Sequence, residues 1–345
     1  MQYIIHDKSY KNIHPIQDDI ERFYALVSDR EYKSNSLLVP TFDECFNQLQ
    51  YLFNVFGGTR FDFKYVKKPV IRPHLPKFNK RNLIVCHSGG KDSTAAVLHY
   101  LKLGYNIHLY HVTGLNKTYY DEYKAVQNIA DYLNLPLKIE DVHYKGYHQW
   151  TEHPMKNMIL ANMALNYGIK EGIGTKVAFG NFYSSTLYSD PFDVTGGDCK
   201  EMWSAYESII KRIIPRFRIY RPFRNFTTTI NTIVKNPEYL PMTISCLTPN
   251  RFRKQLREKN QKKYGYPQLP NRCGSCWKCC LEYIVFCDHN ILPFDEKYYE
   301  HCLQILKYNS KKESNIVYNN IRDLWYDYVF YDIKKSKLFP ALQLY

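Results

Sequence analysis

The stretch RNLIVCHSGGKDSTAAVLHYLKL, from Arg81 to Leu103, predicts the fold of the chain around it. Its segment LIVCH is a short apolar run typical of a buried strand, and residues 93–103 have the spacing of a helix. Between them, Gly89 and Gly90 let the backbone approach an anion closely and adopt conformations closed to other residues. Free amides at the start of the helix, together with the helix dipole, favour a bound phosphate. A glycine turn without a ligand is the alternative.

The side chains of this loop suit the same purpose. Lys91 adds a positive charge, and Ser88 and Ser93 add hydroxyl donors. Asp92 is unusual at an anion site unless it binds a magnesium ion or orients the loop. The G-x-x-x-x-G-K-[ST] pattern is not met, because it needs a glycine where Val85 stands and a hydroxyl residue where Asp92 stands. The G-x-G-x-x-G dinucleotide pattern fails as well.

Strand and helix patterns alternate on the C-terminal side of this stretch. Strands are expected at 106–112, 137–142, 176–181 and 217–223, and helices at 119–133, 155–172 and 199–214. The alternation predicts an α/β fold with a doubly wound, mostly parallel sheet. Ligands of such sheets lie beyond the carboxyl ends of the strands, where the loop of residues 88–93 is expected.

The flanking regions have a different character. Residues 1–80 form an N-terminal extension, with an amphipathic helix expected at 41–56 and a proline-rich, basic connector at 67–80. The main domain spans 81–290. Residues 291–345 form a C-terminal helical extension, with helical patterns at 297–308 and 319–331. We therefore expect helical additions at both ends of the α/β domain.

A cysteine-rich module occupies residues 245–287. Cys273, Cys276 and Cys279 have the spacing C-x-x-C-x-x-C, and Cys246 lies 27 residues before the first of them. One tight knuckle can supply two or three thiolates to a tetrahedral ion, so these four residues predict a structural Zn²⁺ site. Its binding energy would stabilise the local fold.

Other assignments of the cysteines stay open. An iron–sulfur cluster also suits the C-x-x-C-x-x-C spacing, and Cys280 and Cys287 compete as the fourth ligand. Three other cysteines are expected to be small buried residues: Cys45, Cys86 and Cys302.

The charge of the chain is strongly basic. It carries 47 Lys and Arg against 33 Asp and Glu, a formal net charge of +14. This favours polyanions such as nucleic acid or nucleotides, although a generally basic surface would give the same number. Much of this positive charge lies in residues 251–272. That stretch is either a solvated helix face or a contact to a nucleic-acid backbone.

No apolar run is long enough for a membrane helix, and the N-terminus lacks a signal-peptide core, so we expect a cytoplasmic protein.

The sequence SGGKDS resembles the signature of the PP-loop ATP pyrophosphatases, the N-type family with S-G-G-x-D-S. Those enzymes hold the β- and γ-phosphates of ATP in the loop and cleave between the α- and β-phosphates, so that the substrate oxygen becomes an adenylate. The resemblance implies that ATP and Mg²⁺ bind at residues 88–93, that Lys91, Asp92 and Ser93 are catalytic, and that His111 and Val112 lie under the adenine.

Several segments between about 82 and 286 together resemble one branch of that family, the 7-cyano-7-deazaguanine synthases. The segments are a helix running into the glycine-ended strand KVAFG, the Asp-Cys helix start GGDCK, and Ser-Cys followed by C-G-x-C-x-x-C. The resemblance implies an ATP-dependent ligase that adenylates 7-carboxy-7-deazaguanine and converts it with ammonia to the amide and the nitrile. It adds Gly180 to the ATP site and Asp198 and Lys200 to the substrate pocket, and we expect a homodimer.

Differences from that branch keep other functions open. The family has arginine where Lys200 stands, and the basic stretch 251–272 is enlarged, which points to a substrate on a nucleic acid or protein. PP-loop tRNA thiolation and sulfonucleotide-reducing enzymes also carry S-G-G-K-D-S. A nucleic-acid-binding module with an inactive loop is the non-enzymatic alternative. Asp198 and Cys199 would also serve as an ordinary helix N-cap and a buried thiol.

Overall fold

The fold is known from a computed structural model that describes residues 2–5, 8–11, 36–41, 62–67, 75–113, 120–141, 156–180, 200–223, 226–246, 248, 250–265, 269 and 271–311. Its centre is a five-stranded parallel sheet in the order β7-β6-β5-β8-β9. The strands are β5 (Asn82–Cys86), β6 (Asn106–Thr113), β7 (Leu137–Asp141), β8 (Lys176–Phe179) and β9 (Arg218–Tyr220). The order reverses at β5, which confirms the doubly wound parallel sheet.

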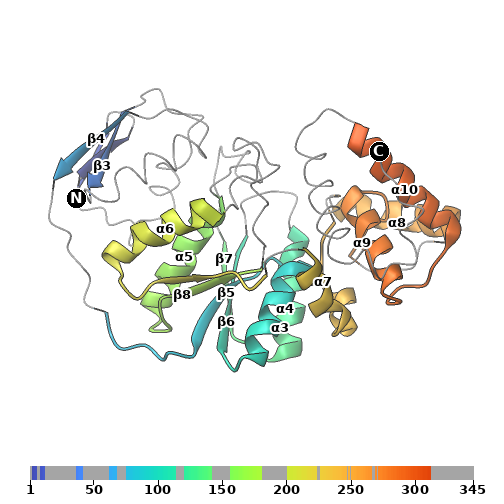
Figure 1. The fold of residues 1–345 in the computed structure, drawn as a ribbon, viewed down its shortest axis with the longest axis horizontal. Coiled ribbons are helices and arrows are strands. Elements are labelled where there is room, and N and C mark those ends of the chain that lie inside the picture. The colour runs from blue at the N-terminus through green and yellow to red at the C-terminus, as the bar shows by residue number, and fades with distance from the viewer. Residues whose placement is uncertain are drawn as a thin grey trace.

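Helices cover both faces of this sheet. They are α3 (Lys91–Lys102), α4 (Tyr120–Leu133), α5 (Lys156–Lys170) and α6 (Lys200–Ile213). Figure 1 shows α3 and α4 on one side of the sheet and α5 and α6 on the other. The predicted alternation is therefore confirmed within a few residues at each end. The strand predicted at 217–223 is shorter, since Pro222 lacks the amide that a continuing ladder needs.

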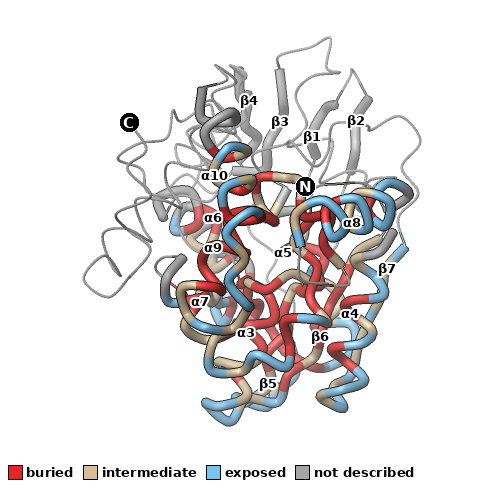
Figure 2. The backbone as a smooth tube through the Cα atoms, turned by 90° about the vertical axis from the view of Figure 1, so that its right-hand side faces the viewer, coloured by how far each residue is buried: buried red, intermediate tan, exposed pale blue. Residues whose placement is uncertain are grey.

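The core lies where the central strand meets the helices. Leu83, Ile84 and Val85 of β5 are completely buried, as expected for a parallel strand covered on both faces. Val85 pairs with Leu109 of β6 and with Ala178 of β8. Buried residues follow these strands through the molecule in Figure 2. This rigid centre carries the predicted phosphate loop at its carboxyl end.

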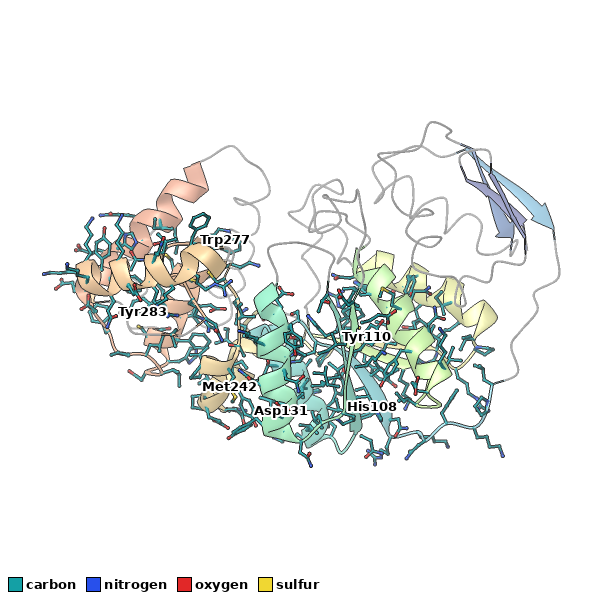
Figure 3. The ribbon with its side chains drawn as sticks, turned by 180° about the vertical axis from the view of Figure 1, so that it is seen from behind. His108, Tyr110, Asp131, Met242, Trp277 and Tyr283 are labelled. Atoms are coloured by element: carbon teal, nitrogen blue, oxygen red, sulfur yellow. The ribbon has the colours of Figure 1, made fainter. Side chains whose placement is uncertain are left out.

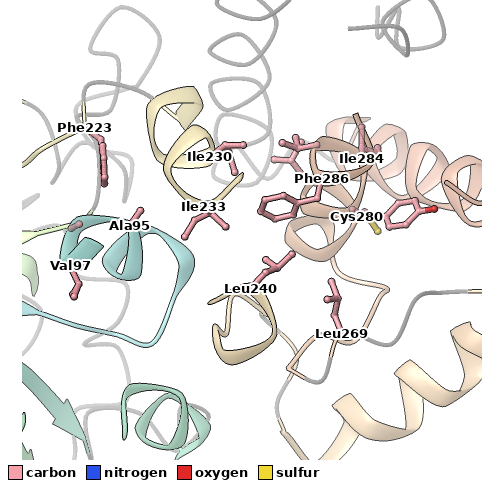
Figure 4. Packing of buried hydrophobic residues seen from close by; sticks show 14 of the residues in the cluster. Ala95, Val97, Phe223, Ile230, Ile233, Leu240, Leu269, Cys280, Ile284 and Phe286 are labelled. Atoms are coloured by element: carbon pink, nitrogen blue, oxygen red, sulfur yellow. The ribbon is translucent and has the colours of Figure 1, made fainter. Parts of the chain in front are cut away.

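The chain continues through α7 (Phe226–Val234), the 3₁₀ helix η4 (Pro237–Met242), α8 (Asn250–Tyr264), α9 (Trp277–Asp288) and α10 (Glu296–Lys311). One hydrophobic cluster joins α3 to α7, η4 and α9, with Ile230, Leu240 and Ile284 among its buried members (Figure 4). Trp277 and Tyr283 of α9 belong to the same cluster (Figure 3). The cysteine module is thus packed against the helices of the sheet.

The two extensions differ from each other. The helix predicted at 297–308 is confirmed by α10, while the pattern at 319–331 lies outside the described residues. The described N-terminal residues include two pairs of strands: β1 (Gln2–Ile5) pairs antiparallel with β2 (Lys8–Lys11), and β3 (Ser36–Thr41) pairs parallel with β4 (Asp62–Lys67). Thr41, the expected capping residue of the helix predicted at 41–56, ends β3, and residues 42–56 lie outside the described residues, so that helix stays a prediction.

Candidate functional site

The loop of residues 88–93 lies at the carboxyl end of β5, where the strand order reverses. Gly89 has φ +75°, and a Cβ on it would lie 2.8 Å from Cβ of Ala125 in α4. Gly90, the residue before α3, has an ordinary extended conformation with φ −79°. The prediction that both glycines need conformations closed to other residues therefore holds for Gly89 alone. Gly90 instead allows a close approach, since a Cβ there would lie 3.3 Å from the carbonyl oxygen of Ile244.

The two serines of the loop have different roles. The hydroxyl of buried Ser93 donates to the carbonyl of Gly90 (3.0 Å) and accepts from the amide of Ser88 (3.3 Å). It therefore closes the loop on itself. Ser88 is exposed, and its Oγ lies 3.4 Å from Oγ of Ser93. The exposed hydroxyl of Ser88 is the one placed to meet a ligand, whereas that of Ser93 holds the backbone in shape.

The ring of His87 holds the loop in shape through hydrogen bonds, a role that the sequence patterns did not predict. Its Nδ1 accepts from the amide of Gly89 (3.0 Å), and its Nε2 lies 3.3 Å from Oγ1 of Thr94, whose hydroxyl donates to Gly90 (2.9 Å). Burial, together with the charge of His111, lowers the pKa of His87 to about 3. The ring therefore stays neutral, with Nδ1 as the acceptor. A histidine directly between a buried strand and the glycines was the available signal.

His111 of β6 lies beside His87. Its Nδ1 donates to the carbonyl of His87 (2.8 Å), and burial lowers its pKa although that hydrogen bond opposes the shift. Val112 follows it in β6 and is half-buried. The structure thus brings His111 to the loop, while the role under an adenine stays a prediction for both residues.

Gly180, directly after β8, touches the other side of the loop. A Cβ on Gly180 would lie 2.2 Å from the carbonyl oxygen of Asp92 and 2.4 Å from Cα of Ser93. Only a residue without a side chain allows this approach, so Gly180 lies directly against the loop, while its part in an ATP site stays a prediction. Of the two substrate candidates, Asp198 lies outside the described residues, and Lys200 is described only as the first residue of α6.

The ammonium group of Lys91 lies close to two carboxylates. Its Nζ donates to both carboxylate oxygens of Asp92, at 2.9 and 3.0 Å, and lies 3.8 Å from Oε1 of Glu282 in α9. Glu282 in turn accepts from Nε of Arg272 at 2.7 Å. Burial would raise the pKa of Glu282, but the charges of Arg272 and Lys91, with hydrogen bonds from Arg272 and Ser245, hold it below its ordinary value. Lys91 therefore lies between two carboxylates.

The four predicted metal ligands come together. The Sγ atoms of Cys246, Cys273, Cys276 and Cys279 all lie within 4.8 Å of one another, with separations of 3.4–4.0 Å for three of the pairs. A tetrahedral ion with Zn–S bonds of about 2.3 Å separates its sulfurs by about 3.8 Å. The donor set therefore fits a single tetrahedral ion. An iron–sulfur cluster would place several ions between the sulfurs and hold them further apart.

Hydrogen bonds around the four sulfurs also suit thiolates. Cys273 Sγ accepts from the amides of Ser275 and Cys276, both at 3.3 Å, and from the hydroxyl of Thr248 at 3.1 Å. The amide of Thr248 donates to Cys246 Sγ at 3.4 Å. Such donors orient the ligands of a metal and stabilise their charge.

The other described cysteines do not compete for this site. Cys280, Cys287 and Cys302 are buried in the hydrophobic cluster of α9 and α10, which removes the first two as fourth ligands. Cys86, expected to be buried, is half-buried, and burial raises the pKa of its thiol. A raised pKa disfavours the thiolate that thiolation chemistry needs. Cys45 lies outside the described residues.

Two links connect the cysteine module to the loop. The amide of Ile244, two residues before Cys246, donates to the carbonyl of Gly89 at 2.8 Å. Arg272, the residue before Cys273, donates to Glu282 and to the carbonyls of Leu240 (3.1 Å) and Thr243 (3.0 Å). The segment 240–246 therefore runs from the carbonyls that Arg272 binds, along the loop of residues 88–93, to Cys246, the first of the four clustered cysteines.

Comparisons with known proteins give a partial likeness. No family model matches the chain. A stretch of 65 residues, 19% of the chain, is 38% identical to 7-cyano-7-deazaguanine synthase of Sulfolobus acidocaldarius. That stretch spans 14% of the synthase. A solved structure described as a predicted subunit of tRNA methyltransferase from Methanocaldococcus jannaschii is 19% identical, covers 43% of this chain and 71% of its own, and has a TM-score of 0.27.

The part of the chain that the structure describes contains no helix long and apolar enough to cross a membrane.

Proposed function

We propose that this protein is an ATP-consuming, AMP-forming enzyme of the PP-loop ATP pyrophosphatase type. The observation that carries the proposal is the loop SGGKDS at the carboxyl end of the central strand, where β5 passes into α3 and the strand order reverses. A tight glycine turn, an uncapped helix start and a lysine are what a polyphosphate needs there. The local identity to 7-cyano-7-deazaguanine synthase supports this reading.

The reaction we propose is the one that this likeness suggests. A carboxylate of 7-carboxy-7-deazaguanine, or of a related compound, attacks the α-phosphorus of ATP, and pyrophosphate leaves. The resulting mixed anhydride has a good leaving group, so ammonia displaces AMP to give the amide, which is activated in turn to give the nitrile. The contribution of the protein is alignment and charge neutralisation around the phosphates.

The loop residues divide this work among them. The exposed hydroxyl of Ser88 and the first amides of α3 bind the β- and γ-phosphates, and Ser93 and His87 keep the loop in shape. Asp92 is the carboxylate at the loop that suits Mg²⁺. Both of its oxygens accept from Lys91 in this structure. Binding of magnesium ATP therefore requires Lys91 to exchange Asp92 for a phosphate, which frees the carboxylate for the metal.

The direct test is product analysis. Purified protein with ATP, magnesium, ammonium and 7-carboxy-7-deazaguanine should release AMP and pyrophosphate, and omission of the carboxylate should abolish the release. The Ser88→Ala, Asp92→Ala double variant should lose AMP formation and keep its metal, because neither residue contacts the four cysteines. Release of ADP in place of AMP would reject the proposal.

A second candidate concerns the substrate, which we propose is carried on a nucleic acid if the free base is not accepted. The supporting observation is α8, most of whose surface is exposed in Figure 2. Its buried side is fixed beside the cysteines, since Asn260 Nδ2 donates to the carbonyl of Cys273 at 2.9 Å. Its exposed face carries four lysines and a single acid, Glu258; the lysines are Lys254, Lys259, Lys262 and Lys263. Such a face matches a phosphate backbone.

Salt-dependent binding distinguishes this candidate. Affinity for single-stranded RNA and DNA should fall steeply between 50 and 200 mM salt (on the order of tenfold or more), and replacing the four lysines of α8 by glutamine should flatten that dependence. The matched control replaces four exposed lysines elsewhere: Lys102, Lys124, Lys138 and Lys170. Equal losses in both variants would mean that only net charge matters and would remove α8 as a specific contact.

A further inference from the structure

A buried chain of charges runs from the cysteine module to the phosphate loop. Arg272 Nε donates to Glu282 Oε2 at 2.7 Å, and Glu282 Oε1 lies 3.8 Å from Lys91 Nζ. The side chain of Arg272 is fully buried, that of Glu282 is 3% exposed and that of Lys91 is 9% exposed. Charges this far from water are retained only where geometry and partners compensate for the lost hydration.

Arg272 is fixed by more than its ion pair. Its Nη1 donates to the carbonyls of Leu240 and Thr243, and its Nη2 donates to Oγ1 of Thr243 at 3.0 Å. The planar guanidinium therefore has donors in use on all three nitrogens, which leaves it little freedom to turn. Because Arg272 directly precedes Cys273, this rigid group is tied to the predicted metal ligands through the main chain.

Glu282 uses only one oxygen for Arg272. The other oxygen, Oε1, lies 3.8 Å from Lys91 Nζ, which is beyond hydrogen-bond distance. A glutamate needed merely to neutralise Arg272 would not have to face the loop. Once Asp92 has left Lys91, the three residues Arg272, Glu282 and Lys91 together carry one net positive charge, which suits a neighbouring polyanion.

We propose that Glu282 is a positioning residue that, held by Arg272, keeps the ammonium of Lys91 at the phosphate loop. The inference rests on the proposed ATP site. When Lys91 leaves Asp92 for the phosphates, the buried carboxylate of Glu282 is the anion that stays beside it and limits where the ammonium moves. Asp92 is thereby released, while Lys91 keeps a fixed place relative to the start of α3.

The test is a double-mutant cycle on the whole protein, with affinity for magnesium ATP measured by calorimetry and metal content measured by elemental analysis. Glu282→Gln keeps the shape and one oxygen for Arg272. It should weaken ATP binding at least tenfold with metal content unchanged. In a Lys91→Met background the same substitution should cause no further loss, because Glu282 acts through Lys91. Thermal unfolding, measured in parallel, reports any purely structural effect of the substitution.

Glu207→Gln is the matched control. Glu207 also pairs with a lysine and an arginine, Lys211 and Arg218, but it lies on α6. The control should leave ATP affinity unchanged. Equal losses of affinity from Glu282→Gln with and without Lys91, or a lowered unfolding temperature with unchanged affinity, would overturn the positioning role alone. Failure of the wild-type protein to bind ATP would overturn the proposed ATP site and this inference with it.

Discussion

Replacing Gly180 by alanine tests the geometry of the phosphate loop without changing its charge or its polar groups. The added Cβ would lie 2.2 Å from the carbonyl oxygen of Asp92 and 2.4 Å from Cα of Ser93, whereas ordinary contacts begin at 3.4 Å. The approach is thus 1.2 Å too close. Both obstacles are main-chain atoms, which cannot rotate away as a side chain can. The start of α3 must therefore move away from β8 by about an ångström.

The size of the effect follows from this displacement. Forcing an extra methyl group into a packed site costs about 1–3 kcal/mol, and immovable backbone places this variant in the upper part of that range. A shift of the start of α3 by about an ångström also disturbs the 3.3 Å hydrogen bond from the amide of Ser88 to Ser93 Oγ, which ties the helix start to the loop. We expect magnesium ATP to bind at least tenfold more weakly, which corresponds to about 1.4 kcal/mol.

Calorimetric titration with magnesium ATP, paired with urea unfolding, measures both consequences. Gly168→Ala is the control, because its Cβ would be equally crowded, 2.2 Å from Cδ1 of Ile84 and 2.5 Å from the carbonyl of Gly174, but away from the loop. It should lose stability and keep its affinity for ATP. A folded Gly180→Ala protein that binds ATP as tightly as wild type would refute the reasoning.

Three further predictions follow from the same site. First, the lowered pKa of His87 means that the native state excludes a proton that the unfolded chain binds below about pH 6.5. Unfolding free energy should therefore fall as pH drops from 6.5 towards 3, by about 2 kcal/mol at pH 5, and urea titrations of wild type and His87→Gln should differ by that slope. Second, Ser93→Ala should lower the free energy of unfolding, measured by urea titration, by about 1 kcal/mol, whereas exposed Ser88→Ala should leave it unchanged and weaken ATP binding only. Third, metal analysis should find one zinc per chain, and its removal by a chelator should lower the unfolding temperature until zinc is restored.

Local pattern predicted the elements of this fold well and its long-range contacts poorly. Buried apolar runs and helical spacing identified β5, β6 and α3 because burial on both faces leaves a plain signature in the sequence. The group of four cysteines that come together was predicted correctly because the spacing of metal-binding cysteines is itself a chemical requirement. In the N-terminal residues the structure describes strands, whose pairing across distant positions has no local signature.

The residues missed at the site share a cause. Arg272 and Glu282 stand beside the cysteines in sequence, and nothing in that neighbourhood indicates contact with a lysine almost two hundred residues away. The apolar pattern predicts His87 only as the end of a strand, yet its ring shapes the loop. Conversely, Ser93 was assigned to the ligand, and the structure shows its hydroxyl bonded within the loop. Sequence patterns identify which residue types form a site. Which of those residues meets the ligand and which holds the loop depends on the orientation of their side chains, and the sequence does not give that orientation.

The cysteine module and the predicted phosphate loop are connected by direct contacts, so a change in the structure of one should change the structure of the other. Ile244 holds Gly89 through its amide and lies two residues before Cys246, so a shift of that ligand pulls directly on the loop backbone. Arg272 precedes Cys273 and reaches Lys91 through Glu282. One link acts on the backbone and the other on the charge of the loop. Metal binding would therefore set the shape of the loop as well as stabilise the fold, because four thiolates around one ion fix both attachment points at once.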